Sequence, residues 1–219
     1  MKYFLPFIAL CLLSACSSSS QYSKLKFPER SSATTEPTFV EIKDTCAKLN
    51  PVLGAFPPRF TENFQSLTAY VLWTNAIISA EKMKESSTPS EELYCILIDL
   101  YRFGHNMDVD TCGRKAVATI DEAVAAYPDS VEIYFTAARF YSSVSNAHAK
   151  QMEEYYLKLR GMLGTEVNKE VEYGLAIAYF KEFDKEKAAA QIEHYLSIYP
   201  DDERMQKFKL LVEGVDEGK

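Results

Sequence analysis

The sequence predicts an all-α fold, and three observations lead to this prediction. Its 219 residues include only 8 Gly and 9 Pro, so long stretches lack a strong breaker of helices. The content of Ala, Leu, Glu, Lys and Tyr favours helix, and continuous runs of β-branched residues are few. Apolar residues also recur at spacings of three and four, which is the period of an amphipathic helix.

The first residues have the pattern of an export signal. Lys2 precedes an apolar run over residues 3–13, which is too short to cross a bilayer because a spanning helix needs about 20 apolar residues. A positive start, a short apolar core and an exit of small residues are typical of a secretory signal peptide. The sequence therefore predicts a signal peptide over residues 1–15.

The signal ends in the four residues Leu13-Ser14-Ala15-Cys16. They resemble the lipobox of bacterial lipoproteins. The resemblance implies cleavage before Cys16, a thioether-linked diacylglycerol on its sulfur, and acylation of the new amine. Such an anchor is stable, because more than one acyl chain is present. The alternative is an ordinary signal peptide whose cleavage site abuts a cysteine.

Residues 16–37 are predicted to be the lipid anchor and a flexible tether. They are rich in Ser, Thr and Pro, so they cannot bury enough apolar surface to offset the entropy of ordering. Ser17 stands where Gram-negative lipoproteins retained in the inner membrane tend to carry Asp. By this analogy we expect the protein in the outer membrane, lipid-anchored and facing the periplasm.

Residues 38–96 are predicted to form an N-terminal helical region. A first helix is expected over 39–49, and Pro51 is expected to stop it because the residue before proline avoids helical angles. Thr61 and Ser90 each precede an amphipathic stretch, so both are expected to be N-caps of further helices.

Residues 97–202 contain an internal repeat. The segments YPDS at 127–130 and YPDD at 199–202 each close an amphipathic stretch and precede another. If each proline is taken as the closing proline of a 34-residue unit, the units start at Leu97 and Lys169 and resemble tetratricopeptide repeats. The first unit fits closely, through Leu100, Phe103, Gly104, Met107, Ala116, Ile120 and Ala123.

The two later units fit less well. The second needs about four extra residues in its second helix, and in the third Glu172 and Tyr195 occupy positions that the pattern gives to other residue types. The resemblance implies a short array of antiparallel helix pairs, in which small residues let paired helices approach closely. Residues 203–219 are expected to form a C-terminal capping helix and tail.

The register of the repeat also predicts which side chains line a binding groove. In a tetratricopeptide array, defined positions of each first helix face the concave surface. An aromatic ladder there could hold the side chains of a peptide, and an arginine could bind a carboxylate. The alternative is that the aromatic residues pack against one another or against a neighbouring helix. The groove candidates are Tyr101, His105, Phe135, Arg139, Tyr173 and Phe180.

Three cysteines remain after the signal and the anchor, namely Cys46, Cys95 and Cys112. An odd number allows at most one intramolecular bridge, and the alternative is three buried, inert thiols. In the repeat register, Cys95 and Cys112 lie well over about 15 Å apart along the helix axes, whereas a disulfide needs Cα atoms within about 7 Å. We therefore expect these two to be unbonded, so that any bridge would use Cys46.

Other chemistry has little support in the sequence. The net charge of −7 argues against nucleic-acid binding, which needs a clustered basic face. No G-x-S-x-G motif or Gly-rich phosphate loop is present, so we expect no catalytic residues, no metal and no cofactor. The segment GHNMDVDTC at 104–112 holds possible metal ligands, but its spacing matches no metal motif, and capping and core roles explain it more simply.

Together these features predict a non-catalytic periplasmic scaffold or adaptor lipoprotein. Its partners would be the membrane, through the lipid on Cys16, and an unidentified envelope-assembly protein or peptide. One alternative is an accessory component that handles solutes in a periplasmic uptake system. Another is a metal-binding or enzymatic protein that uses residues 104–112. The sequence predicts no oligomeric state.

Overall fold

The computed structural model describes residues 25–61 and 65–214, so the signal peptide and Cys16 lie outside the described residues. Within these ranges the chain forms helices and no strand, which confirms the all-α prediction. None of these helices is both long enough and apolar enough to cross a membrane. The described helices are η1 (Arg30–Ser32), α1 (Phe39–Leu53), α2 (Ser66–Ser86), α3 (Glu91–Asn106), α4 (Cys112–Ala126), α5 (Val131–Ser143), η2 (Asn146–His148), α6 (Ala149–Leu163), α7 (Lys169–Lys181), α8 (Lys185–Ile198) and α9 (Glu203–Glu213).

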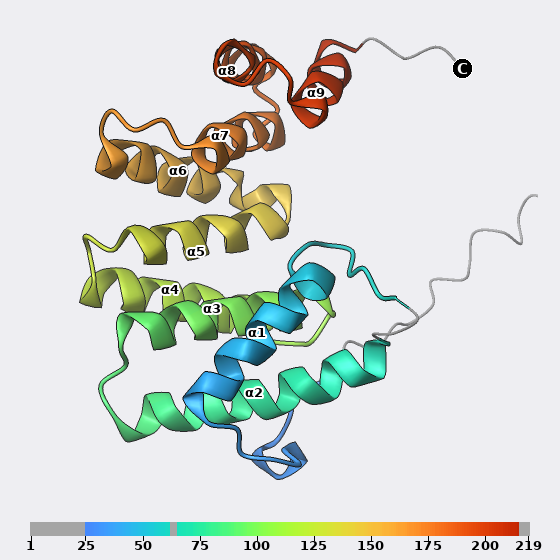
Figure 1. The fold of residues 1–219 in the computed structure, drawn as a ribbon, viewed down its shortest axis with the longest axis vertical. Coiled ribbons are helices and arrows are strands. Elements are labelled where there is room, and N and C mark those ends of the chain that lie inside the picture. The colour runs from blue at the N-terminus through green and yellow to red at the C-terminus, as the bar shows by residue number, and fades with distance from the viewer. Residues whose placement is uncertain (1–24, 62–64, 215–219) are drawn as a thin grey trace, which may run out of the picture.

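The helices after residue 90 form a stack of hairpins. Helices α3 and α4, α5 and α6, and α7 and α8 pack as neighbouring pairs, and the pairs follow one another along the long axis of the molecule (Figure 1). Helix α9 packs on α8 at the C-terminal end, and α1 packs on both α2 and α3 at the other end. The predicted array of helix pairs is therefore present.

Short polar side chains begin several of these helices. Ser90 accepts a hydrogen bond from the backbone N–H of Leu93, as its position in the sequence predicts. Ser130 and Asp202, the last residues of the two YPD segments, cap α5 and α9 in the same way. The repeated YPD segment thus ends one hairpin and starts the next helix.

Two helix boundaries differ from the prediction. Helix α1 continues past Pro51 to Leu53, because its last turn is closed by the N–H of Gly54 on the carbonyl of Asn50 and Leu53 is buried. Proline removes only one hydrogen bond of that turn. Helix α2 begins at Ser66 rather than directly after Thr61, and its first buried residue is Ala69.

The chain from residue 25 to 37 lies against the helices, whereas the sequence predicted a flexible tether there. The ring of Phe27 packs edge-on against Trp73, with centroids 6.0 Å apart. The side chain of Asn75 accepts a hydrogen bond of 2.8 Å from the backbone N–H of Thr34. Both contacts join residues more than forty positions apart.

Trp73 lies at the centre of the N-terminal core. Its side chain is fully buried, and its indole N–H donates to the carbonyl of Leu100 at 2.6 Å. Gly104 lets α3 approach this ring and α4 closely. A Cβ at Gly104 would lie 2.5 Å from both the Trp73 ring and the Cys112 sulfur, so the small residue of the first repeat has a packing cause.

The two residues that did not fit the third repeat have polar partners. Glu172 is 3% exposed, and its carboxylate accepts hydrogen bonds from Arg160 on α6 and Gln191 on α8. Tyr195 is fully buried, and its hydroxyl donates to Asp202 at 2.7 Å. Buried polar groups are tolerated when they are hydrogen-bonded in this way.

The buried apolar residues fall into two clusters. The larger cluster extends from α1 to α7. The smaller one joins α7, α8 and α9, and its buried members are Ala176, Ala188, Ile192, Tyr195, Met205 and Val212.

Cys46, Cys95 and Cys112 carry free thiols in this structure. Burial raises the pKa of each thiol to about 12. A thiol with such a pKa is almost entirely protonated near neutral pH, and the protonated form is a poor nucleophile and metal ligand. Cys112 is a buried core residue, whereas Cys46 and Cys95 are half-buried and pack against the core.

Candidate functional site

The six groove candidates do not form one continuous surface. Tyr101 is 4% exposed, because Phe27 and α2 cover it and its hydroxyl donates to Glu81 at 2.7 Å. Phe135 is 9% exposed, and the guanidinium of Arg139 lies 5.5 Å from the centre of its ring. These two rings are thus part of the packing rather than an open ladder.

Two further candidates lie apart from the others. The ring of His105 packs against Phe140, with centroids 6.2 Å apart, and borders a separate cavity. Phe180 is partly exposed near the C-terminal end, where its ring packs edge-on against Phe208 of α9 at 5.2 Å. Neither residue shares a site with Arg139.

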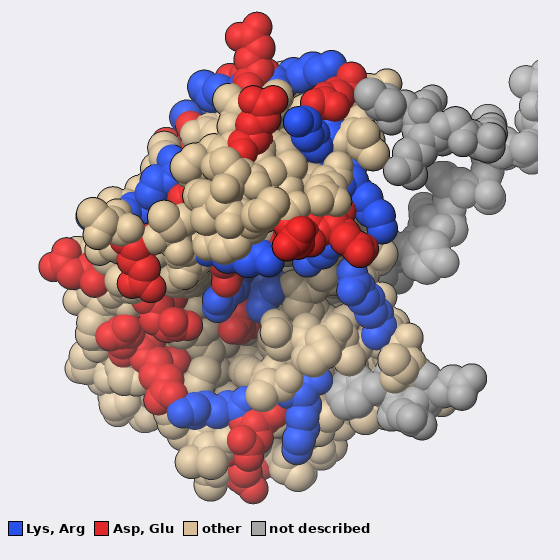
Figure 2. Space-filling view, turned by 45° about the horizontal axis from the view of Figure 1, so that its top comes forward, with Lys and Arg blue, Asp and Glu red and all other residues tan. Residues whose placement is uncertain are grey.

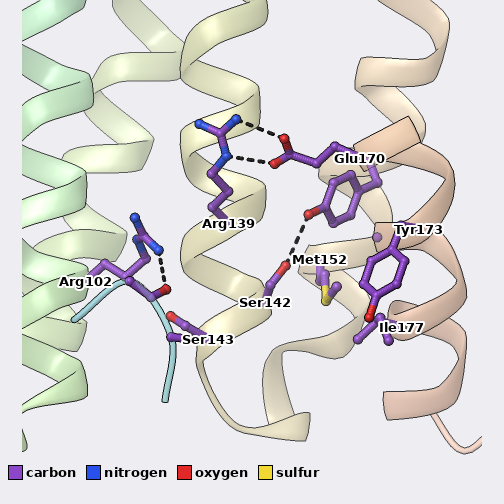
Figure 3. A pocket seen from close by; sticks show the side chains of 12 residues that line it. Arg102, Arg139, Ser142, Ser143, Met152, Glu170, Tyr173 and Ile177 are labelled. Atoms are coloured by element: carbon purple, nitrogen blue, oxygen red, sulfur yellow. Dashed lines mark hydrogen bonds and ion pairs between the residues drawn. The ribbon is translucent and has the colours of Figure 1, made fainter. Parts of the chain in front are cut away.

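Arg139 and Tyr173 do come together, at a cleft of about 380 Å³ that we call the inner cleft. It lies between α3, α5, α6, α7 and the loop that follows α1. Its lining includes Arg102, Arg139, Ser142, Glu170, Tyr173 and Ile177 (Figure 3). In the space-filling view, basic and acidic side chains surround a hollow in the middle of the visible face (Figure 2).

Arg102 forms one wall of the inner cleft and is almost fully buried. Its guanidinium donates to the carbonyl of Gly54, to the side chain of Asn50 at 2.9 Å and to Asp99 at 2.7 Å. These bonds fasten the end of α1 to α3. Because its donors are occupied inside the fold, Arg102 shapes the cleft rather than offering a free charge.

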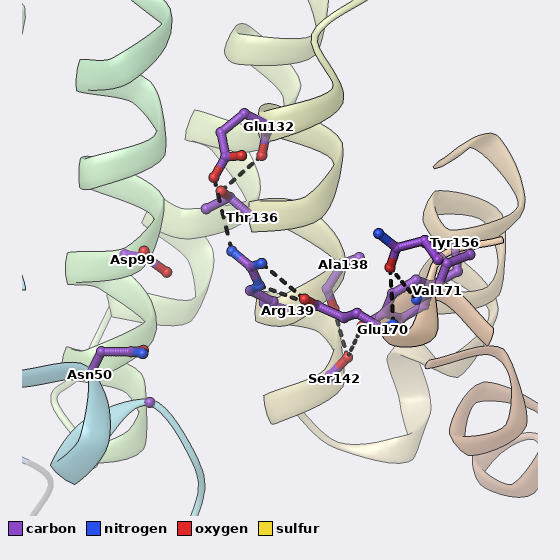
Figure 4. Close-up of polar contacts among 12 residues, drawn as sticks. Asn50, Asp99, Glu132, Thr136, Ala138, Arg139, Ser142, Tyr156, Glu170 and Val171 are labelled. Carbon is purple, nitrogen blue, oxygen red and sulfur yellow. Dashed lines mark hydrogen bonds and ion pairs between the residues drawn. The ribbon is translucent and has the colours of Figure 1, made fainter. Parts of the chain in front are cut away.

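Arg139 is the accessible cation of the inner cleft. Its Nε and Nη2 atoms donate to the two carboxylate oxygens of Glu170 at 2.7 and 3.0 Å (Figure 4). The hydrogen bonds that Arg139 donates to Glu170 raise the pKa of Arg139 further above its usual value, so it stays charged. Its Nη1 atom is 4.0 Å from Glu132, which is beyond hydrogen-bond distance.

The ion pair joins two hairpins and is open to solvent. The side chains of Arg139 and Glu170 are 38% and 41% exposed. Asn168 caps α7 by accepting hydrogen bonds from the N–H groups of Glu170 and Val171, which sets the position of the glutamate. A pair that is exposed to this degree contributes about 0–1 kcal/mol to stability, so another carboxylate can replace Glu170 at little cost.

The floor of the inner cleft is largely apolar. Met152 and Ile177 line it together with the ring of Tyr156, whose hydroxyl lies 3.2 Å from that of Ser142. An apolar floor beside a few placed charges is the usual composition of a ligand site. The inner cleft can therefore hold an apolar side chain and a carboxylate at the same time.

The segment 104–112 places its polar side chains in different surroundings. The side chain of Asn106 is buried and donates to the carbonyl of Leu53 at 2.7 Å. Cys112 is buried, whereas Asp108 and Asp110 are exposed. Among the described residues, no group of three or more His, Cys, Asp or Glu side chains is arranged to hold a metal ion.

Sequence reasoning found part of this site. Arg139 and Tyr173 are groove candidates of the sequence, and both border the inner cleft. Arg102 was missed, because its position in the repeat gives no sign that α1 folds back onto α3. Only the contact between these two helices reveals its role.

Comparisons with known proteins add no relative to this picture. The chain matches no protein-family model, no curated protein and no solved structure at a significant level.

Proposed function

We propose that this chain is a non-catalytic, lipid-anchored adaptor in the periplasm, whose inner cleft binds a peptide segment of an envelope-assembly protein. The observation that supports it best is the accessible Arg139–Glu170 pair beside an apolar floor. The export signal and the lipobox of the sequence support the location at the outer membrane.

Recognition follows from the charges and the shape of the inner cleft. A carboxylate of the peptide replaces Glu170 on Arg139, with the two parallel hydrogen bonds that a guanidinium offers. An adjacent apolar side chain of the peptide occupies the floor beside Ile177 and Tyr173. Arginine and tyrosine are the residue types that most often dominate the energy of an interface.

The anchor has a direct test in the mature N-terminus of the native protein. We expect mass spectrometry to find Cys16 as the first residue, with a diacylglycerol on its sulfur and an acyl group on its amine. We expect Cys16→Ala to leave the chain uncut or cut elsewhere, and without lipid. An unmodified Cys16, or a chain that starts elsewhere, would contradict the lipoprotein assignment.

Binding in the inner cleft is tested by site-specific photocrosslinking in the native envelope. A photoreactive residue in place of Ile177 is expected to crosslink a discrete partner. The matched control replaces Ala190, an exposed residue of α8 outside the cleft. Equal crosslinking from both positions, or none from Ile177, would argue against the inner cleft as the binding site.

Arg139→Ala separates binding from folding in the same assay. We expect the Ile177 crosslink to weaken by about 30-fold or more, since truncation of an interface hot spot costs about 2 kcal/mol or more. The melting temperature should change little, because the ion pair is exposed. Arg114→Ala is the control, since this exposed arginine of α4 lies outside the inner cleft. Equal crosslinking in both variants would exclude the proposed role of Arg139.

A further inference from the structure

Exposed apolar side chains gather in one part of the described structure. Eleven large apolar residues of the described chain are exposed, and six of them belong to residues 25–71. All of these six except Val40 lie at residue 25, in the loop that follows α1 or in the first turns of α2. In Figure 1 this loop and the start of α2 lie on the same side of the molecule. We call the five residues the N-terminal patch, namely Leu25, Phe56, Phe60, Leu67 and Val71.

The centre of the N-terminal patch is a shallow cavity. Leu25, Phe56 and Phe60 border a space of about 360 Å³, together with Tyr70 and Met107. Phe56 is 62% exposed and Phe60 is 43% exposed, so neither ring is needed to complete the core. Leu67 and Val71 are also exposed, in the first turns of α2, and each lies about 100° around the helix axis from its neighbour Ser66 or Tyr70, which borders the cavity.

Two cations lie next to these apolar residues in the chain. Lys26 follows Leu25 and Arg59 precedes Phe60, and both are exposed. Neither side chain takes part in an ion pair within the described residues. Exposed aromatic rings beside cations are typical of a surface that contacts phospholipid headgroups. One acidic residue, Asp108, borders the cavity as well.

The distance from the predicted anchor links this patch to a bilayer. Leu25 follows Cys16 by nine residues, which span at most about 30 Å when fully extended. Leu25 belongs to the patch, so a lipid on Cys16 would keep this face near the membrane. The face around Phe183 has no such short connection to the anchor.

We propose that the N-terminal patch contacts the phospholipid surface to which Cys16 is anchored. The rings of Phe56 and Phe60 enter the boundary between headgroups and acyl chains, while Lys26 and Arg59 lie among the phosphates. This contact fixes the orientation of the hairpin array on the membrane. The inference depends on the lipid anchor of the proposed function, but not on peptide binding in the inner cleft.

The test uses the lipidated protein, with the lipid on Cys16 confirmed by mass before any vesicle is added. The protein is reconstituted in vesicles of phosphatidylethanolamine and phosphatidylglycerol with brominated acyl chains, which quench nearby tryptophan. Phe60→Trp carries the probe in the patch, and Phe183→Trp carries it at the most exposed apolar residue of the C-terminal half. The unsubstituted protein gives the background from buried Trp73.

The fluorescence of the new tryptophan in Phe60→Trp, above the Trp73 background, is expected to fall by about half or more in the brominated vesicles. The reason is that side chains at an interfacial site enter the boundary between headgroups and acyl chains by about 5–10 Å. The emission added by Phe183→Trp is expected to stay unquenched. Equal quenching of both, or none for Phe60→Trp, overturns the membrane contact while the anchor stands. A detergent-stable dimer that the double variant Phe56→Ser, Phe60→Ser abolishes would assign the patch to a second copy, and overturns it too.

Discussion

Trp73→Ala is expected to lower the free energy of unfolding by about 3–5 kcal/mol, the usual cost of removing an aromatic side chain from a core. The indole is fully buried, packs against Phe27 and touches α3 at Gly104. The substitution also removes the hydrogen bond to the carbonyl of Leu100. Urea unfolding followed by circular dichroism measures the effect, because the chain has no other tryptophan for fluorescence.

The matched control for this prediction is Leu67→Ala on the same helix. Leu67 is 71% exposed, so its truncation should change the free energy of unfolding by no more than about 0.5 kcal/mol. If Trp73→Ala cost no more than Leu67→Ala, then α2 and α3 would not pack around the indole as described.

Gly174→Ala is expected to destabilise the protein by about 1–3 kcal/mol, the range for overpacking a filled interior. A Cβ at this position would lie 2.2 Å from the ring of Tyr156 on α6. The ring is buried, and its hydroxyl lies 3.2 Å from that of Ser142, so the side chain has little room to move. The steric cost exceeds the gain in helix propensity, which is about 1 kcal/mol.

Gly161→Ala is the control for the effect of helix propensity alone. Gly161 lies in α6, and a Cβ there would meet no atom within 4 Å. This substitution should therefore stabilise the protein by about 0.5–1 kcal/mol. Thermal and urea unfolding of the two variants should move in opposite directions. A Gly174→Ala protein as stable as Gly161→Ala would show that α6 and α7 are further apart than described.

The features that depend on nearby residues could be predicted from the sequence. Ser90 caps α3 because its side chain meets an N–H only three residues away. Gly104 marks a close helix approach because the repeat spacing places a small residue there. The helices of the hairpins can be predicted from the spacing of the apolar residues, because this spacing is a local pattern.

The features that depend on distant residues could not be predicted. Nothing near Phe27 in the sequence indicates that its ring meets Trp73, so residues 25–37 read as a tether. The end of α1 likewise depends on burial of its last turn against other helices. A prediction from composition alone takes no account of contacts between residues that are far apart in the sequence.

The same limit explains the outcome for the candidate site. The register predicts which positions of α3, α5 and α7 face the groove, but the exposure of a side chain depends on what covers that face. Tyr101 is covered by α2 and Phe27, whereas Tyr173 borders the inner cleft. Arg139 is accessible because its partner, Glu170, lies on the next hairpin rather than in the core.

The division of the apolar core into two clusters has a consequence for how the molecule opens. The smaller cluster has six buried residues, so separating α8 and α9 from α7 exposes far less apolar surface than global unfolding does. In a linear array each hairpin is held mainly by its neighbours, so the end can fray while the rest stays folded. The boundary of this cooperative unit is α7, which carries Tyr173 and Glu170. We therefore expect the edge of the inner cleft to lie where the end of the array that opens first meets the helices that stay folded.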